Sequence, residues 1–431
     1  MMKRQQYLEQ LVTEKEDRLI KMITGIRGCG KTYLLFNIYH HYLNTIGVDD
    51  DHIIEIALDD EANAKYRNPI ELEEYIRSKM KDKDKTYYLF LDEILNIETV
   101  ENPYRAGSKD IIGFTTALLS LLQIDNLDIY ATSSNARAVS IELPSRYRFS
   151  IKEIQMYPLT FSEFMDVYQG DEDEGFKEYS TYGGLPYVVL EKDHAKKEEY
   201  LKNLFSIIYQ KEIMKWRNVK HKESLNDILE VLASTTGKQI GASQISQTIN
   251  ASGKTFISRS GVEIYSEEFK QAYLISNLII FEILNERDIC LPKKHYFADI
   301  GLRNAMLNFQ LDEEEPIMEH IIYNNLLATG YTADIGSVRF TDRDENGKCL
   351  RLNLEIDFVA SYLRRKKVCF QTLLSLDDEE KRIQAAAPYQ HICDDYTKIV
   401  IVKDDIDPFT DEDGVRYAGI KTLLLKPGAV L

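Results

Sequence analysis

Three mostly apolar segments before residue 135 have the length and composition of buried strands. They are residues 19–23, 87–91 and 127–131. Segments of this kind are typical of parallel sheets, in which helices cover both faces of each strand. Residues 33–39, which follow the first segment, have a pattern that suits a helix. The chain therefore begins with a predicted α/β domain built around a parallel sheet.

A glycine-rich turn connects the first strand to this helix and reads Gly25-Ile26-Arg27-Gly28-Cys29-Gly30-Lys31-Thr32. This is a complete G-x-x-x-x-G-K-T phosphate loop, in which glycines let backbone N–H groups surround a polyphosphate. The helix that begins at Lys31 adds its positive end at the same point. Lys31 is expected to reach the β- and γ-phosphates, and the Thr32 hydroxyl is expected to bind Mg²⁺.

The second strand ends in an acidic pair, Asp92 and Glu93. One carboxylate at such a strand end can hold Mg²⁺, and its neighbour can polarise the attacking water. An acidic pair can also be an ordinary exposed strand end. Because a phosphate loop precedes it in the same predicted sheet, we expect Asp92 to bind the metal and Glu93 to activate water.

The third strand ends in residues 133–135, Ser-Ser-Asn. A polar side chain there could contact the γ-phosphate or the lytic water, although such clusters also simply end strands. Farther along, Arg146 or Arg148 could act as an arginine finger, from the same chain or from a neighbouring subunit. The alternative is that these arginines lie on the surface and pair with local carboxylates.

The order of these motifs resembles that of a large prokaryotic family of AAA+-type ATPases. The resemblance is carried by G-I-R-G-C-G-K-T, L-D-E-I, T-S-S-N, S-R-Y and Y-P-L-T-F-S-E-F, followed by Y-G-G-L-P, A-D-I-G-L and E-I-D-F-V. These segments extend over essentially the whole chain. Members of the family often have Gln after D-E-I, and this chain departs from that pattern with Leu95.

The resemblance implies an N-terminal AAA+ domain that uses ATP and Mg²⁺, and a C-terminal region with a restriction-endonuclease-like core. The implied catalytic residues are Glu93, Lys31, Asn135 and Arg146, and the implied metal ligands are Thr32 and Asp92. With Tyr33 added from the start of the helix, the predicted nucleotide-binding residues are Gly25, Arg27, Gly28, Cys29, Gly30, Lys31, Thr32 and Tyr33. GTP-binding proteins usually contain an N-K-x-D element, and the sequence has none, so adenine is the expected base.

Turn and composition signals divide the chain into four predicted parts. They are a P-loop AAA+ domain at 1–168, a helical lid and linker at 169–222, a winged-helix domain at 223–290, and a restriction-endonuclease-like α/β domain at 291–431. The acidic, glycine-containing stretch 169–175 is predicted to be a loop, and Pro186 is predicted to begin a helix. The helices expected in the winged-helix part are residues 225–232, 243–249 and 262–275.

Composition indicates a folded protein with ample material for buried cores: 431 residues, of which 44% are apolar. No run approaches the roughly 20 apolar residues that span a membrane, and the first residues lack the apolar core of a signal peptide. The five cysteines are scattered without a C-x-x-C pair, which argues against structural zinc. We therefore expect a cytoplasmic protein without a membrane partner.

The net charge of −17, from 53 basic against 70 acidic residues, opposes a general nucleic-acid-binding surface. A local basic run surrounds Trp216, but such runs are usually the solvated face of a helix. Its members are Lys211, Lys215, Arg217, Lys220, His221 and Lys222. The third helix of the winged-helix part has Glu263, Glu267 and Glu268 against Lys270 alone, so protein contact or packing is favoured there over DNA reading.

The C-terminal part contains Glu319, Asp357 and Gln371, which match the places of the acidic metal ligands in restriction-endonuclease-like nucleases. A lysine should follow two residues after Gln371, where this chain has Leu373. Leucine cannot stabilise a pentavalent phosphate or orient a hydroxide. We therefore expect this domain to be catalytically degenerate.

Two functions from different classes fit these observations. The first is a Mg²⁺-dependent, ATP-hydrolysing switch or motor that acts on an unidentified protein partner through its C-terminal domains. The second is a nucleotide-gated nucleic-acid-binding module with little hydrolysis. Glu93 beside Asp92 favours the first, because binding alone requires no water-activating carboxylate. The sequence leaves both a hexameric ring and smaller assemblies open.

Overall fold

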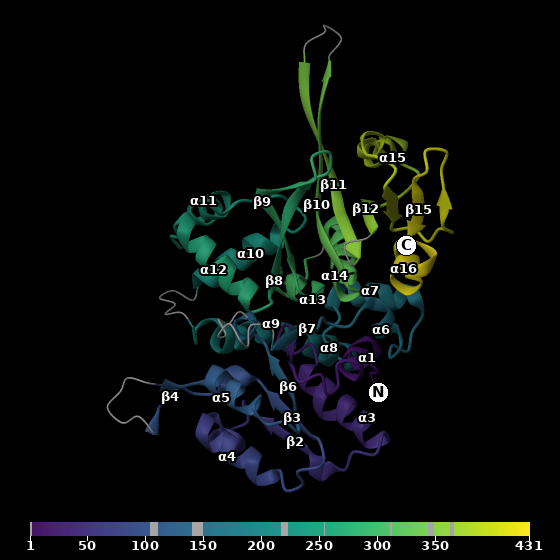
Figure 1. The fold of residues 1–431 in the computed structure, drawn as a ribbon. Coiled ribbons are helices and arrows are strands. Elements are labelled where there is room, and N and C mark those ends of the chain that lie inside the picture. The colour runs from purple at the N-terminus through teal and green to yellow at the C-terminus, as the bar shows by residue number, and fades with distance from the viewer. Residues whose placement is uncertain are drawn as a thin grey trace. The chain divides into compact units, whose positions relative to one another are not determined.

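The computed structural model describes residues 2–103, 111–139, 150–216, 223–253, 255–310, 313–343, 349–362 and 366–431. Its contacts divide the chain into two compact units, residues 1–156 with 271–273, and residues 157–270 with 274–431. Each unit contains a large sheet of its own (Figure 1).

A five-stranded parallel sheet forms the centre of the first unit, in the order β2-β3-β6-β1-β7. Its strands are β1 (Ile20–Thr24), β2 (Ile53–Ala57), β3 (Tyr87–Asp92), β6 (Leu127–Ser133) and β7 (Ile151–Gln155). Every residue of the three inner strands is buried, as expected where helices cover both faces. The predicted α/β domain with a parallel sheet is confirmed.

Helices cover both faces of this sheet (Figure 1). They are α1 (Gln5–Thr13), α2 (Lys31–Tyr33), the π-helical segment Leu34–Tyr39, α3 (His40–Thr45), α4 (Pro69–Lys79) and α5 (Phe114–Leu121). Leu72 of α4 and Leu118 of α5 belong to the core on one face. On the other face, the hydroxyls of Tyr39 and Tyr130 lie 2.6 Å apart. A separate two-stranded pair consists of β4 (Val100–Glu101) and β5 (Ile111–Ile112).

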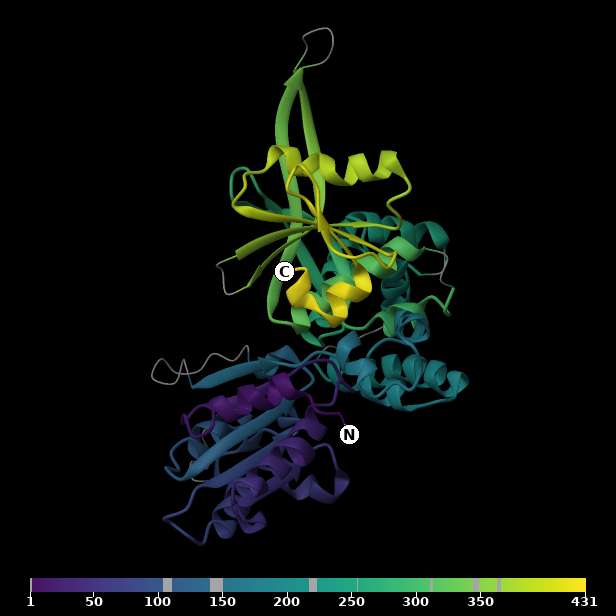
Figure 2. The same cartoon turned by 90° about the vertical axis from the view of Figure 1, so that its right-hand side faces the viewer.

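The second unit contains a mixed eight-stranded sheet in the order β14-β15-β13-β12-β11-β10-β8-β9. The strands are β8 (Ile275–Glu282), β9 (Arg287–Phe297), β10 (Tyr331–Arg343), β11 (Cys349–Tyr362), β12 (Lys366–Leu373), β13 (Tyr396–Val402), β14 (Phe409–Thr410) and β15 (Arg416–Gly419). β10 and β11 are antiparallel and extend beyond the other strands of the sheet (Figures 1 and 2).

The helices of the second unit form a helical region before the sheet and cover the sheet itself. They are α6 (Phe161–Met165), α7 (Glu172–Tyr182), α8 (Pro186–Leu190), α9 (His194–Ile208), α10 (Glu223–Ser234), α11 (Ala242–Ser252), α12 (Arg259–Gln271), α13 (Ile300–Met306), α14 (Glu314–Ala328), α15 (Glu379–Ala386) and α16 (Ile420–Leu425). α14 and α16 pack together against the sheet, and the turned view shows α16 in yellow (Figure 2). Among the described residues, no helix is long and apolar enough to cross a membrane.

The structure corrects the predicted third helix of the winged-helix part. That helix is α12, which ends at Gln271, and Ile275 begins strand β8 instead of ending the helix. Tyr273 has a φ of 53°, so the backbone leaves the helical conformation between the two elements. The predicted boundary between residues 290 and 291 falls inside β9, whose pairing with β8 is part of the sheet. The winged-helix and endonuclease-like assignments stay predictions.

A buried ion pair joins two strands of the first unit. The Lys21 ammonium of β1 lies 2.5 Å from a carboxylate oxygen of Asp128 on β6 and 2.8 Å from Asp17. The side chains of Lys21 and Asp128 are 0% and 2% exposed, and Asp128 also accepts a hydrogen bond from the Tyr130 hydroxyl. Removing Asp128 would take away the buried partner of the Lys21 ammonium and leave Asp17, which is 28% exposed, to compensate its charge.

We predict that Asp128→Ala lowers the free energy of unfolding by about 3–5 kcal/mol, measured by urea denaturation. The control is Asp125→Ala, which removes a partner from an exposed pair with Arg18 and should cost less than about 1 kcal/mol. The double variant Lys21→Met/Asp128→Leu should recover most of the loss. Equal effects of the two alanine variants would contradict the assigned role of the buried pair.

Candidate functional site

The phosphate loop connects β1 to α2, as the sequence predicts, and its backbone requires glycine. Gly25 has a φ of 141°, and a Cβ there would lie 2.1 Å from the carbonyl oxygen of Met156. Gly30 precedes α2 with a φ of 102°, a conformation that residues with a side chain rarely adopt. The conformation of the loop at these two positions therefore depends on glycine.

Lys31 places its ammonium inside this loop. The Nζ atom donates to the carbonyl oxygens of Gly25 at 2.9 Å and Ile26 at 3.2 Å, and to the Ser134 hydroxyl at 2.9 Å. The residue is 5% exposed. A buried cation within a glycine-rich loop is suited to neutralise the negative charge of a polyphosphate.

Thr32 and Asp92 meet at the carboxyl ends of β1 and β3. The Thr32 hydroxyl lies 2.9 Å from both carboxylate oxygens of Asp92, and the Thr132 hydroxyl donates to the same carboxylate at 2.6 Å. Burial and the neighbouring Glu93 raise the pKa of Asp92 above its ordinary value. A hydroxyl and a carboxylate are oxygen ligands of the kind that Mg²⁺ prefers.

Glu93 is held in an unusual backbone conformation directly after β3. Its φ is 53°, which costs on the order of 1–3 kcal/mol for a residue with a side chain. Its carboxylate accepts hydrogen bonds from the Ser134 hydroxyl at 2.5 Å and the Ser134 amide at 3.2 Å, and lies 3.5 Å from the Arg27 guanidinium. Burial alone would raise the pKa of Glu93, but Lys31, Arg27 and Ser134 outweigh it and lower the pKa.

Ser134 is the site residue that the sequence analysis did not single out. Its hydroxyl contacts both Lys31 and Glu93. The adjacent Asn135, predicted to be catalytic, is buried, and its side-chain oxygen accepts from the amide of Arg137 at the start of a short 3₁₀ turn. The Ser-Ser-Asn sequence marked the right strand end, but strand alternation decides which of the three side chains faces the loop.

The other predicted site residues lie as follows. Arg27 pairs with Asp59 at 3.0 Å as well as with Glu93. Cys29 is fully buried, with its thiol 3.6 Å from the carbonyl oxygen of Met156, and Tyr33 is half-buried at the end of α2. Gly28 has a positive φ of 86°. Arg146 and Arg148 lie outside the described residues, as do Arg217, Lys220, His221 and Lys222 of the basic run.

These residues fit ATP with Mg²⁺. The glycine-lined loop would take the phosphates, Lys31 would neutralise their charge, and Thr32 with Asp92 would hold the metal. When bound, Mg²⁺ supplies positive charge to the phosphate oxygens as negative charge develops on them. Among the described residues, no group of three or more His, Cys, Asp and Glu side chains could hold a metal ion by itself.

The second unit gathers a buried charged cluster on α14, β9, β11 and β12. Gln371 accepts from the Asp357 amide at 3.3 Å, and the Thr372 hydroxyl donates to Asp357 at 2.8 Å. Lys294 of β9 lies 2.6 Å from Glu355 and 3.6 Å from Glu319. In related nucleases the spacing predicts a lysine at position 373. This chain has Leu373 there, and its side chain is buried in the core. Tertiary structure brings Lys294 to the carboxylates instead.

Burial and mutual charge shift the titration of this cluster. Burial and the nearby Asp357 raise the pKa of Glu319 to about 8, although Lys294 and a hydrogen bond from Tyr296 oppose the shift. Burial alone would lower the pKa of Lys294, but the surrounding carboxylates raise it. The folded protein therefore binds the Glu319 proton more tightly than the unfolded chain, whose ordinary value is 4.5.

We predict that this proton makes stability depend on pH. The stabilisation is complete below the unfolded pKa and is lost as pH rises through the folded value near 8. Glu319→Gln imitates the neutral acid. As pH rises, its unfolding free energy should fall less steeply than that of the wild type, by up to about 1.4 kcal/mol per pH unit. Urea denaturation at a series of pH values measures this. The exposed control Glu380→Gln should leave the slope unchanged; an unchanged slope in Glu319→Gln would contradict the assignment.

Comparison with known proteins agrees with the geometry of the first unit. Residues 17–165 match a family described as an AAA domain, and residues 173–313 match a domain of unknown function. An uncharacterised protein of Haemophilus influenzae is 26% identical, with 99% of both chains covered. One of Methanocaldococcus jannaschii is 24% identical, with 85% of this chain and 77% of the relative covered.

Two solved structures are among those with a similar fold. The Walker-type ATPase of Pyrococcus abyssi has a TM-score of 0.49 at 15% identity, covering 71% of this chain and 96% of that one. The RuvB Holliday junction branch migration motor of Thermotoga maritima has a TM-score of 0.32 at 15% identity, covering 63% and 88%. At these TM-scores neither likeness assigns a function. The family match and the parallel sheet with its phosphate loop show that the N-terminal part of the chain is an AAA domain of the P-loop ATPase type.

Proposed function

We propose that the first unit binds ATP with Mg²⁺ and hydrolyses it, and that the nucleotide state controls a protein partner through the second unit. The observation that carries the proposal is the contact of one hydroxyl, that of Ser134, with both Lys31 and Glu93. This contact joins Lys31, which is expected at the phosphates, and Glu93, which is expected at the attacking water, in one hydrogen-bonded group.

Glu93 is the proposed general base. Its lowered pKa keeps the carboxylate ionised at neutral pH, so it can accept a hydrogen bond from the attacking water. Lys31 would leave its loop carbonyls for the β- and γ-phosphates when ATP enters, and Ser134 would continue to orient the Glu93 carboxylate. Thr32 and Asp92 would hold the metal.

Coupling to a partner rests on the helices that follow the nucleotide domain. In AAA+ proteins a small helical lid swings with nucleotide state, and such movements convert binding into mechanical change. Helices α7, α8 and α9 occupy the predicted lid region. We propose that they respond to ATP and pass this response to the rest of the second unit.

The Lys31→Ala and Glu93→Gln variants should separate binding from hydrolysis. Lys31→Ala should lose Mg²⁺-dependent ATP turnover together with ATP affinity, because the phosphates lose their cation. Glu93→Gln should keep ATP binding and lose turnover by about 10²–10⁴-fold. Steady-state phosphate release and ATP titration calorimetry measure the two properties.

Normal turnover in Lys31→Ala would refute hydrolysis at this site. The coupling is tested with the same proteins, by hydrogen exchange in α7 to α9. Exchange in Glu93→Gln with ATP should differ from exchange in Lys31→Ala with ATP. Identical exchange, with ATP bound to Glu93→Gln, would refute the coupling and leave the hydrolysis proposal standing.

A matched pair of neighbouring substitutions tests the role of Ser134. Ser134→Ala removes the hydroxyl that orients Glu93 and contacts Lys31, so kcat should fall by about tenfold or more, the equivalent of roughly 1.5 kcal/mol for a hydrogen bond to a charged group. Asn135→Ala removes a turn cap, so it should mainly lower thermal stability, by about 1 kcal/mol. A larger loss of kcat in Asn135→Ala would instead support the sequence-based assignment of Asn135.

A further inference from the structure

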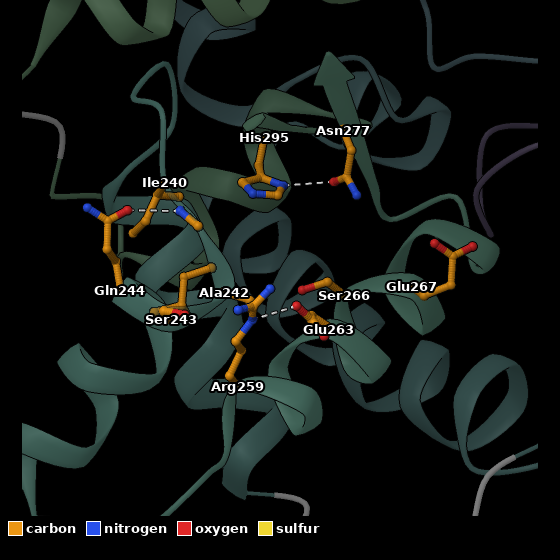
Figure 3. Close-up of a pocket in the computed structure, with 12 residues that line it drawn as sticks. Ile240, Ala242, Ser243, Gln244, Arg259, Glu263, Ser266, Glu267, Asn277 and His295 are labelled. Carbon is orange, nitrogen blue, oxygen red and sulfur yellow. Dashed lines mark hydrogen bonds and ion pairs between the residues drawn. The ribbon is translucent and has the colours of Figure 1, made fainter. Parts of the chain in front are cut away.

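A cavity of about 550 Å³ lies in the second unit, and its lining includes none of the residues assigned to the proposed ATP site (Figure 3). The first turn of α11, one face of α12 and the paired strands β8 and β9 form its walls. Small-molecule sites usually measure about 300–1,000 Å³. The cavity lies within residues 173–313, which match a domain of unknown function.

The inner wall of the cavity contains a fixed imidazole. His295 is 6% exposed and its Nδ1 atom lies 2.7 Å from the side-chain oxygen of Asn277, its partner on the neighbouring strand. Figure 3 shows the ring facing Arg259 across the cavity. A ring held in this way has one orientation before any ligand enters.

Arg259 lies at the mouth, with its guanidinium directed into the cavity (Figure 3). Its Nε atom pairs with Glu263 at 2.9 Å. In the part of the chain that the structure describes, the two Nη atoms have no hydrogen-bond partner. A guanidinium edge with two free N–H groups matches the two oxygens of a carboxylate or phosphate.

Further donors lie on the two helices that line the cavity. The hydroxyls of Ser243 and Ser266 have no hydrogen bond to other described residues. The amides of Ala242 and Ser243 belong to the first turn of α11, where backbone N–H groups have no intrahelical acceptor. The Gln244 side chain is turned back to accept from the Gly241 amide at 3.0 Å. These hydroxyls and first-turn amides are hydrogen-bond donors, and the carboxylates of Glu263 and Glu267 lie on the α12 side of the cavity.

We propose that this cavity binds a small ligand that carries an oxyanion, either a carboxylate or a phosphate, on an apolar body. The Nη edge of Arg259, the two serine hydroxyls and the first-turn amides of α11 hold the oxyanion. The apolar side chains of Ile240 and Ile245, which also line the cavity, contact the body of the ligand. This site is separate from the proposed ATP site and does not require hydrolysis.

The ion pair between Glu263 and Arg259 allows a test with two variants of opposite expected effect. The Glu263 carboxylate pairs with the same guanidinium that the ligand would use, so it competes for charge. Removing Arg259 and removing Glu263 should therefore change anion affinity in opposite directions. A structural role of the ion pair alone predicts no such opposition.

The experiment titrates the full chain with phenyl phosphate, benzoate and neutral benzyl alcohol by saturation-transfer NMR. The titrations use the Lys31→Ala background, so that the phosphate loop does not hold the phosphate probe. At least one anion should bind in the millimolar range or tighter, about tenfold more tightly than benzyl alcohol. Arg259→Gln should weaken that anion about tenfold, and Glu263→Gln should tighten it several-fold.

Preference for phenyl phosphate identifies a phosphate ligand, and preference for benzoate identifies a carboxylate ligand. Binding of neither anion, or equal binding of the anions and benzyl alcohol, would overturn the proposal. So would anion affinity that Arg259→Gln leaves unchanged. Thermal denaturation of each variant confirms that the folded state is retained, since Arg259 and Glu263 are both more than half exposed, at 63% and 51%.

Discussion

The hydroxyl of Ser134 joins the two charged residues on which the nucleotide site depends. It accepts from the Lys31 ammonium and donates to the Glu93 carboxylate. This contact exists because β1, β3 and β6 are parallel neighbours, so that their carboxyl ends open at one edge of the sheet. The phosphate loop, the acidic pair and the Ser-Ser-Asn turn each follow one of these strands.

The two adjacent carboxylates of the site differ because their surroundings differ. Burial and the neighbouring Glu93 raise the pKa of Asp92 against the hydrogen bonds from Thr132 and Thr32. Burial would also raise the pKa of Glu93, but the charges of Lys31 and Arg27 outweigh it and lower the pKa. Glu93 also adopts a left-handed backbone conformation, which the amide hydrogen bond to the Thr132 hydroxyl helps to stabilise at 2.9 Å. This conformation directs the carboxylates of two consecutive residues into different surroundings.

Buried charge in the second unit is organised around Lys294 in a comparable way. Its ammonium lies next to Glu355 and Glu319. Burial, together with the nearby Asp357, raises the pKa of Glu319 to about 8, so this carboxyl retains a proton near neutral pH. The cavity of α11 and α12 differs from both charged clusters, because several of its donors have no partner in the described chain. Buried charged groups that have hydrogen-bond partners within the protein belong to the folded framework. Hydrogen-bond donors in a cavity that have no such partner are available to a ligand.

The sequence by itself determined the elements whose residues are close in the chain: the phosphate loop, the strands next to it, and the acidic pair Asp92 and Glu93 at the end of β3. These features depend on local spacing and uninterrupted apolar runs. Tertiary structure decided that Ser134, and not Asn135, faces Lys31, and that Lys294 reaches Glu319 from a separate strand. Those contacts join residues distant in the sequence, so strand pairing and side-chain direction, which no local pattern encodes, determine them.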